Sequence, residues 1–187
     1  MTNWTDKNIL ILGAARQGLA LARYLTKHGA KVTLNDKRMP NELKDEQDSL
    51  KDIDVEWMLG AHFSSLLNGK DLVCLSGGIP LNLPIVRDAQ RRKTPLSNDT
   101  QIFLEDCPCR TIGITGSAGK TTTTTIVGRI AKEAFRKSEN KVWVGGNIGD
   151  PLLNYVDEMK EDDLAILEIS SFQLDQISLS TNIAALL

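Results

Sequence analysis

Residues 111–121 read TIGITGSAGKT, and they join an apolar run, a glycine-rich turn and a Lys-Thr pair. The run at 111–115 is typical of a buried strand, and residues 120–135 are expected to form a helix. A turn that leads from a strand into a helix gathers backbone N–H groups into an anion site. The stretch therefore predicts a parallel α/β sheet that carries a phosphate-binding loop.

The predicted loop has the three parts that a nucleoside triphosphate requires. Glycines let amides converge on the phosphate oxygens, a lysine binds the β- and γ-phosphates, and a hydroxyl binds Mg²⁺. Standard Gly-x-x-x-x-Gly-Lys spacing would require a glycine at position 114, where the chain has Ile114, so this loop is a shortened variant. The residues expected to bind the triphosphate are Gly116, Ser117, Ala118, Gly119, Lys120, Thr121 and Thr122.

Short apolar runs alternate with amphipathic segments through the rest of the chain. Further strands are expected at residues 8–12, 31–35, 54–58, 72–75, 141–144 and 164–169, and a helix at 17–28. This alternation predicts the α/β class, with parallel sheets and crossover helices. A joint near residues 94–97 divides the chain into domains at 1–95 and 96–187. Residues 183–187 have the character of a parallel strand buried on both faces, so we expect the sequence to be a piece of a longer protein.

The first domain has its own candidate site after its first strand. The segment Gly13-Ala14-Ala15-Arg16-Gln17-Gly18 opens a helix, but Ala15 stands where a dinucleotide fingerprint has its middle glycine. Asp36 ends the second strand and is placed to accept hydrogen bonds from a ribose or a base. Two interpretations remain open: a site for a nucleotide-type ligand, or a plain turn in which Ala15 packs the helix on the sheet.

A third motif, Glu168-Ile169-Ser170-Ser171-Phe172-Gln173, lies at the carboxyl end of a strand in the second domain. Ligands bind at this edge of open α/β sheets. Glu168 is therefore expected to hold Mg²⁺ opposite Thr121, since Mg²⁺ prefers carboxylate oxygens. The alternative is a helix cap or a salt bridge at Glu168. Asn147, in the glycine-rich segment 145–149, supplies a donor and an acceptor at the same edge.

Composition excludes several classes of protein. The chain has 187 residues, 22 Lys plus Arg, 24 Asp plus Glu, a net charge of −2 and 41% hydrophobic residues. These values exclude a disordered tail and a disulfide-rich secreted module, and they argue against nucleic acid as the main partner. No apolar run reaches the roughly 18 residues of a membrane span. The spacing of Cys107 and Cys109 fits neither a zinc site nor a thioredoxin-type motif, so we expect a reducing, cytoplasmic setting.

Taken together, these motifs resemble those of the Mur ligase family. Members of that family carry Gly-Thr-Asn-Gly-Lys-[Ser/Thr] where this chain has Gly-Ser-Ala-Gly-Lys-Thr, which explains the short loop. The segments 145–149 and 168–174 are specific to the family in combination. The N-terminal pattern and Ser76-Gly77-Gly78-Ile79-Pro80 favour the members that add D-glutamate. The resemblance covers essentially the whole chain.

The resemblance implies a fold and an activity. Residues 1–95 would be a Rossmann-like domain for the UDP end of the substrate, and residues 96–187 the N-terminal part of a P-loop ATPase domain. A C-terminal domain for the incoming amino acid would be absent. The family uses ATP and Mg²⁺ to convert a substrate carboxylate into an acyl phosphate, which the amine of D-glutamate attacks. The implied reaction joins D-glutamate to UDP-N-acetylmuramoyl-L-alanine in peptidoglycan synthesis, and the chain alone is expected to be inactive.

The resemblance also implies roles for individual residues. The expected catalytic residues are Lys120, Asn147 and Glu168, and the expected metal ligands are Thr121 and Glu168. The implied substrate-binding residues are Arg16, Gln17, Asp36, Lys37, Arg38, Gly78, Asn147, Ser170 and Gln173. Two alternatives stay open. Another amino acid could be the one added, or the first domain could bind NAD(P), with Lys37 and Arg38 meeting a 2′-phosphate.

Overall fold

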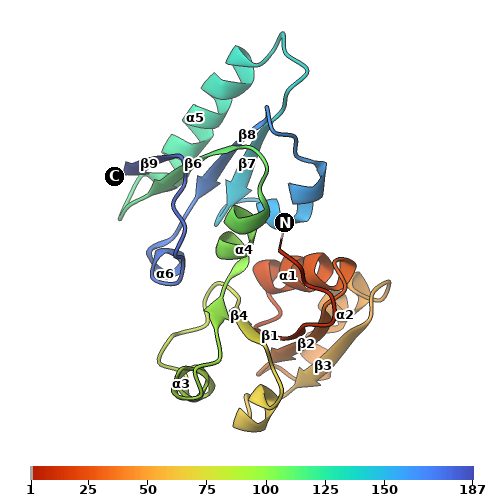
Figure 1. Ribbon diagram of the computed structural model, residues 1–187. Helices are drawn as coiled ribbons and strands as arrows, with labels where there is room; N and C mark the ends of the chain where they lie inside the picture. Colours follow the sequence, from red (N-terminus) through yellow and green to blue (C-terminus); the bar gives the residue numbers. More distant parts are fainter. Residues whose placement is uncertain (1) are drawn as a thin grey trace. The chain divides into compact units, whose positions relative to one another are not determined.

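The computed structural model describes residues 2–187, which form two compact units, residues 2–99 and 100–187. Each unit is built on its own parallel sheet, so the expected α/β class is confirmed (Figure 1). The division lies a few residues after the expected joint at 95/96, because the short strand β5 (Leu96–Ser97) pairs with the sheet of the first unit. No helix among residues 2–187 has the length and apolar character needed to cross a membrane.

The first unit has a five-stranded sheet with the order β3-β2-β1-β4-β5. Its strands are β1 (Asn8–Leu12), β2 (Lys31–Asp36), β3 (Val55–Leu59), β4 (Leu72–Leu75) and β5. Its helices are α1 (Arg16–Lys27), α2 (Lys44–Ser49) and α3 (Pro84–Arg91), with 3₁₀ turns at Pro40–Glu42 and Ser64–Leu67. Ile9, Ile11 and Leu12 are fully buried, as expected for the central strand of a sheet covered on both faces.

The order of these strands places the first candidate site. The chain passes from β1 to β2 on one side of β1 and later to β4 on the other side, so the strand order reverses at β1. Ligands of open α/β sheets bind outside the carboxyl ends of strands at such a reversal. The turn that follows β1 and opens helix α1 lies there.

The second unit has a four-stranded sheet with the order β7-β8-β6-β9. Its strands are β6 (Arg110–Thr115), β7 (Val142–Gly146), β8 (Leu164–Glu168) and β9 (Ile183–Leu186). Its helices are α4 (Asp99–Asp106), α5 (Lys120–Ala134) and α6 (Ser171–Leu174), with a 3₁₀ segment at Leu152–Glu158.

Helix α5 covers one face of the second sheet. A Cβ added at Gly128 would lie 2.8 Å from the Cγ2 of Val144, so this glycine lets the helix approach β7 closely. Strand register puts Ile166 and Ile112 in line with Val144, on the face that α5 covers. Two residues further along each strand, Glu168 and Ile114 share that face.

Strand β9 differs from its prediction. Residues 183–186 do form a parallel strand beside β6, but Ile183 is 61% and Leu186 is 83% exposed. The prediction of a strand buried on both faces was therefore wrong. Apolar composition indicates a strand but not its place in the sheet, and β9 is an edge strand that pairs with β6.

Candidate functional site

The glycine-rich loop joins strand β6 to helix α5, as predicted. Gly116 and Gly119 have φ angles of +140° and +78°, which glycine adopts without the clash that a Cβ would cause. Gly119 is the N-cap of α5 and has no side chain to bond the first N–H groups of the helix. Those N–H groups and the positive end of a 15-residue helix are therefore directed at an exposed loop, which is the arrangement of an anion site.

Lys120 lies back over this loop. Its Nζ donates a hydrogen bond to the carbonyl oxygen of Gly116 at 2.8 Å, so the ammonium group sits at the mouth of the turn. Ser117, Ala118 and Gly119 are exposed between these two residues. The loop thus combines convergent amides with one positive charge, the combination that phosphate oxygens require.

A buried carboxylate joins the loop to two neighbouring strands. Glu168, at the end of β8, is 3% exposed. Its Oε2 accepts a hydrogen bond from Oγ1 of Thr121 at 2.7 Å, and its Oε1 accepts one from Nδ2 of Asn147 at 3.1 Å. The alternative role as a helix cap does not fit, because the N-cap of α6 is Ser170. The salt-bridge alternative does not fit either, because the side chains that donate to Glu168 are a hydroxyl and an amide and not a basic group.

Gly146 allows this cluster to form. Its φ is +100°, and a Cβ at this position would lie 2.5 Å from the carbonyl oxygen of Glu168. The close approach lets the backbone N–H of Asn147 donate to that same carbonyl at 2.8 Å. The three residues predicted at this edge, Thr121, Asn147 and Glu168, therefore lie together in the second unit.

Ser170 and Gln173 hold each other at the start of helix α6. The backbone N–H and Oγ of Ser170 contact Oε1 of Gln173 at 2.9 and 3.1 Å, and the backbone N–H of Gln173 donates to Ser170 Oγ. Nε2 of Gln173 donates to Oγ1 of Thr100 at 2.8 Å, and Gln173 is 4% exposed. The structure thus gives both residues a role in holding α6, next to the Glu168 cluster where substrate contacts are expected.

In the first unit, Asp36 organises the turn after β1. Its carboxylate accepts hydrogen bonds from the backbone N–H of Ala14 at 2.8 Å and from that of Arg38 at 3.0 Å. The Arg38 guanidinium adds an ion pair at 3.0 Å and also contacts Glu46 at 3.1 Å. Burial alone would raise the pKa of Asp36, but these hydrogen bonds and the Arg38 charge lower it to about 2. Asp36 therefore stabilises the turn after β1 by accepting hydrogen bonds from backbone N–H groups.

The other predicted residues of the first unit differ in accessibility. Gln17 is 7% exposed and lies against Gly77, whereas Arg16 and Lys37 are exposed. Gly78 is exposed with a φ of +96°. An exposed arginine at the first position of helix α1 and an exposed lysine after β2 leave positive charge at the carboxyl edge of the sheet.

Sequence reasoning missed a polar pair beside Asp36. Nδ1 of His62 lies 2.5 Å from Oδ1 of Asn35, whose Nδ2 donates to the carbonyls of Met58 and Ala61. Burial lowers the pKa of His62, although the nearby Asp36 charge opposes this. The available signal was Asn35 itself, a buried polar residue one position before the end of β2, which needs buried partners.

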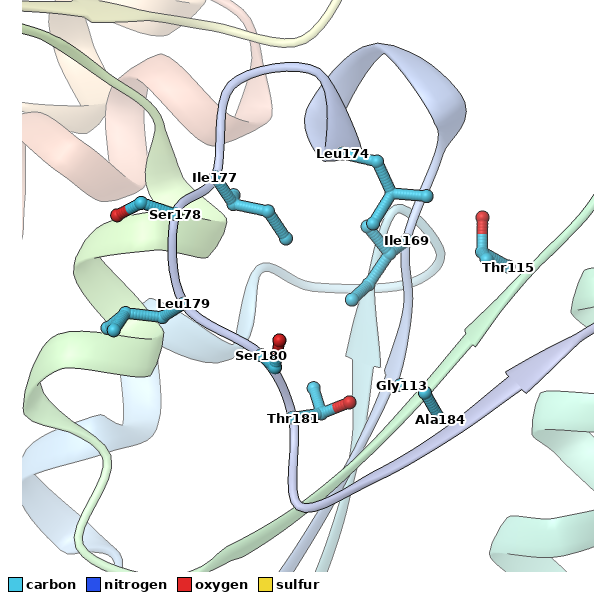
Figure 2. Close-up of a pocket in the computed structure, with 10 residues that line it drawn as sticks. All are labelled: Gly113, Thr115, Ile169, Leu174, Ile177, Ser178, Leu179, Ser180, Thr181 and Ala184. Carbon is cyan, nitrogen blue, oxygen red and sulfur yellow. The ribbon is translucent and has the colours of Figure 1, made fainter.

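A cavity of about 240 Å³ lies on the other face of the second sheet (Figure 2). Gly113, Thr115 and Ala184 form its floor, and the segment 174–181 passes over it. Because side chains alternate along a strand, Gly113 and Thr115 point away from the face that carries Ile114, Glu168 and helix α5. The cavity is thus separate from the loop and its carboxylate cluster.

Comparison with known proteins identifies the class. Residues 7–97 match the family domain described as "Mur ligase MurD-like, N-terminal domain", and residues 114–187 match the "Mur ligase middle domain". The chain belongs to the Mur ligase family. Within that family, its N-terminal part is of the MurD-like kind.

Curated relatives include UDP-N-acetylmuramoylalanine–D-glutamate ligases. The chain is 36% identical to the one from Ruminiclostridium cellulolyticum over 97% of its own length and 38% of the relative's. It is 35% identical to the one from Acetivibrio thermocellus over 96% of its own length and 38% of the relative's. The chain therefore spans less than half the length of these relatives.

Solved structures support the fold. A UDP-N-acetylmuramate:L-alanyl-γ-D-glutamyl-meso-diaminopimelate ligase from Neisseria matches with a TM-score of 0.54 at 17% identity, over 90% of this chain and 55% of that one. The UDP-N-acetylmuramate–alanine ligase of Thermotoga maritima matches with a TM-score of 0.50 at 19% identity, over 88% and 37% of the two chains.

Proposed function

We propose that these residues supply the nucleotide-sugar-binding and ATP-binding parts of a ligase that joins D-glutamate to UDP-N-acetylmuramoyl-L-alanine. The cluster of Thr121, Asn147 and Glu168 beside the Lys120 loop is the observation that carries this proposal. The named relatives support the choice of D-glutamate. Uridine nucleotides and ATP are cytoplasmic compounds, so the proposed reaction is cytoplasmic.

The second unit offers oxygen ligands for Mg²⁺ and hydrogen-bond donors for the phosphates of ATP. Mg²⁺ is usually held by one or two carboxylates together with phosphate oxygens and water, and Glu168 with Thr121 Oγ1 offers such a set. Lys120 and the amides of residues 116–122 would bind the β- and γ-phosphates. The bound metal would neutralise charge on the phosphates during transfer. Asn147 would position the substrate carboxylate that accepts the phosphoryl group, while the side-chain amide of Asn147 keeps its hydrogen bond to Glu168.

The proposed reaction needs positioning and charge neutralisation more than acid–base chemistry. Phosphoryl transfer gives an acyl phosphate, and the amine of D-glutamate then attacks its carbonyl carbon and expels phosphate. A fixed lysine and preorganised amides favour the charge that develops on the transferred group. Ser170 and Gln173 support the acceptor side by holding helix α6 at the end of β8.

The first unit would hold the UDP end of the substrate at the turn between β1 and α1. Arg16, Gln17, Lys37, Arg38 and Gly78 would line this site. Arg38 already binds two carboxylates, so its part would be to fix the turn together with Asp36. Arg16 and Lys37 are both exposed and would supply positive charge for phosphate oxygens.

Calorimetric titration of the purified chain tests the proposal. UDP-N-acetylmuramoyl-L-alanine and UDP should bind saturably, whereas NAD should give no heat. ATP with Mg²⁺ should bind, and Lys120→Ala should weaken that binding about tenfold or more, because a charge-assisted hydrogen bond to phosphate is lost. Lys132→Ala, on the exposed last turn of the same helix, is the matched control and should leave ATP affinity unchanged.

Other outcomes would contradict the assignment. Binding of NAD without binding of uridine ligands would favour the NAD(P)-binding alternative for the first unit. Equal ATP affinity in wild type and Lys120→Ala would show that the loop does not hold the phosphates. Turnover with a different amino acid, measured in a chain that includes the rest of the relatives' length, would favour another Mur ligase.

A further inference from the structure

Two cysteine thiols lie close together in the short segment before β6, the first strand of the second sheet. Cys107 and Cys109 flank Pro108 between the end of helix α4 and the start of strand β6. Their sulfur atoms lie 3.5 Å apart, and Sγ of Cys107 lies 3.6 Å from the carbonyl oxygen of Cys109. The backbone N–H of Cys107 donates to the carbonyl of Phe103 at 2.8 Å, which fixes Cys107 at the helix end. Neither sulfur takes part in the proposed ligase site.

The two thiols differ in accessibility and in acidity. Cys107 is half-buried, whereas Cys109 is 7% exposed. The hydrogen-bonding contact with the Cys109 thiol lowers the pKa of Cys107, although burial opposes this. The same contact, together with burial and the charge of the nearby Asp163, raises the pKa of Cys109. The accessible sulfur therefore has the greater thiolate character, the pattern of a reactive thiol beside a resolving one.

We propose that Cys107 and Cys109 form a redox-sensitive dithiol that a hydroperoxide converts into an intramolecular disulfide. The Cys107 thiolate attacks one peroxide oxygen, the O–O bond breaks, and the products are a sulfenic acid on Cys107 and hydroxide. The Cys109 sulfur then attacks the Cys107 sulfur, the S–O bond breaks, and water leaves with the thiol proton. With hydrogen peroxide, two thiols lose two electrons and two protons, and two waters form.

The two sulfur atoms are already close to each other. A disulfide requires about 2.05 Å between sulfurs, so the two atoms must approach by about 1.5 Å. A metal site explains the pair less well, because the described residues contain no group of three or more His, Cys, Asp or Glu that could hold an ion. The proposal does not depend on the ligase function.

Peptide mapping of the full chain tests the proposal. The reduced protein is treated with hydrogen peroxide near one equivalent, its remaining thiols are blocked with iodoacetamide under denaturing conditions, and it is digested with trypsin. Both cysteines fall in the peptide 94–110, while Cys74 falls in the peptide 71–87. We expect the peptide 94–110 to lose two hydrogen masses and to carry no alkyl group, and dithiothreitol to reverse both changes. Cys74, buried in β4, should remain fully alkylated.

Variants separate the pair from general oxidation. Cys107→Ser and Cys109→Ser should each abolish the loss of two hydrogens, whereas Cys74→Ser should leave it unchanged. Addition of oxygen to Cys107 without that loss would overturn the proposal. So would disulfides between two chains in place of the internal one, or equal oxidation of Cys74. If a serine variant does not fold, the masses of the tryptic peptides from the oxidised wild-type protein still decide between these outcomes.

Discussion

Asp36 should stabilise the first unit in a way that depends on pH. Asp36 is 6% exposed, and its carboxylate accepts hydrogen bonds from two backbone N–H groups and pairs with Arg38. Its pKa falls from the ordinary value of 3.8 to about 2 in the folded state. A lowered carboxylate pKa means that the stabilisation is complete above the unfolded value and is lost as pH falls through the folded value. The window is therefore pH 4 down to about pH 2.

The size of the effect follows from the pKa difference. A gap from 3.8 to about 2 corresponds to about 2 kcal/mol of unfolding free energy. We expect Asp36→Asn to destabilise the first unit by about this amount at pH 7. The difference between wild type and variant should then shrink toward zero near pH 2. Because every other carboxylate titrates in both proteins, this difference isolates Asp36.

Urea unfolding in a Trp143→Phe background provides the assay. The remaining tryptophans, Trp4 and Trp57, both lie in the first unit, so fluorescence then reports that unit alone. Asp52→Asn is the matched control, because Asp52 makes a solvent-exposed ion pair with Arg23. Exposed pairs contribute only about 0–1 kcal/mol, so this control should show little loss at any pH. A difference for Asp36→Asn that stays constant from pH 7 to pH 2 would refute the reasoning.

Two predictions concern the second unit. Gly146→Ala should lower stability by about 1–3 kcal/mol, since the residue has a positive φ and its new Cβ would meet the carbonyl of Glu168. The same substitution should weaken ATP binding by displacing Asn147. Urea unfolding measures the loss of stability and calorimetry measures the ATP affinity. An unchanged urea midpoint would contradict the predicted loss of stability. Asp163→Ala should cost about 2 kcal/mol or more, because Asp163 is 4% exposed and accepts a hydrogen bond from the Trp143 indole at 2.9 Å. Urea unfolding with Trp143 as the sole tryptophan checks this, and a loss within 0.5 kcal/mol, the range of surface changes, would count against it.

Most of the fold could be predicted from the sequence because its strands are buried and apolar. The runs at 8–12, 72–75 and 164–168 have few polar residues, and glycines mark the turns that follow the first two. Strand β5 was missed because two residues carry no periodicity. The exposure of β9 was missed because apolar composition predicts a strand but does not say which edges the sheet leaves open.

The candidate site, like the fold, could be predicted from the sequence only in part. Thr121 and Glu168 were expected to meet because parallel strands bring their carboxyl ends to one edge, and Thr121 opens the helix that follows such a strand. The bond from Gln173 to Thr100 joins residues far apart in the chain, and no local pattern encodes it. The pairing of Asp36 with Arg38 depends on the turn after β2, so sequence alone left both residues open to a ligand role.

The order in which the strands of the second sheet are made along the chain affects how the glycine-rich loop between β6 and α5 forms during synthesis. In the first unit, β1, β2 and β3 are neighbours in sequence and in space, so the nascent chain can pair them as they leave the ribosome. Strand β6 is different, because its two neighbours are β8 and β9, both of which follow it by a long interval. Non-local pairing of this kind slows folding. The ribosome therefore completes the loop long before β8, whose Glu168 accepts the hydrogen bond from Thr121, and the edge strand β9 have been made.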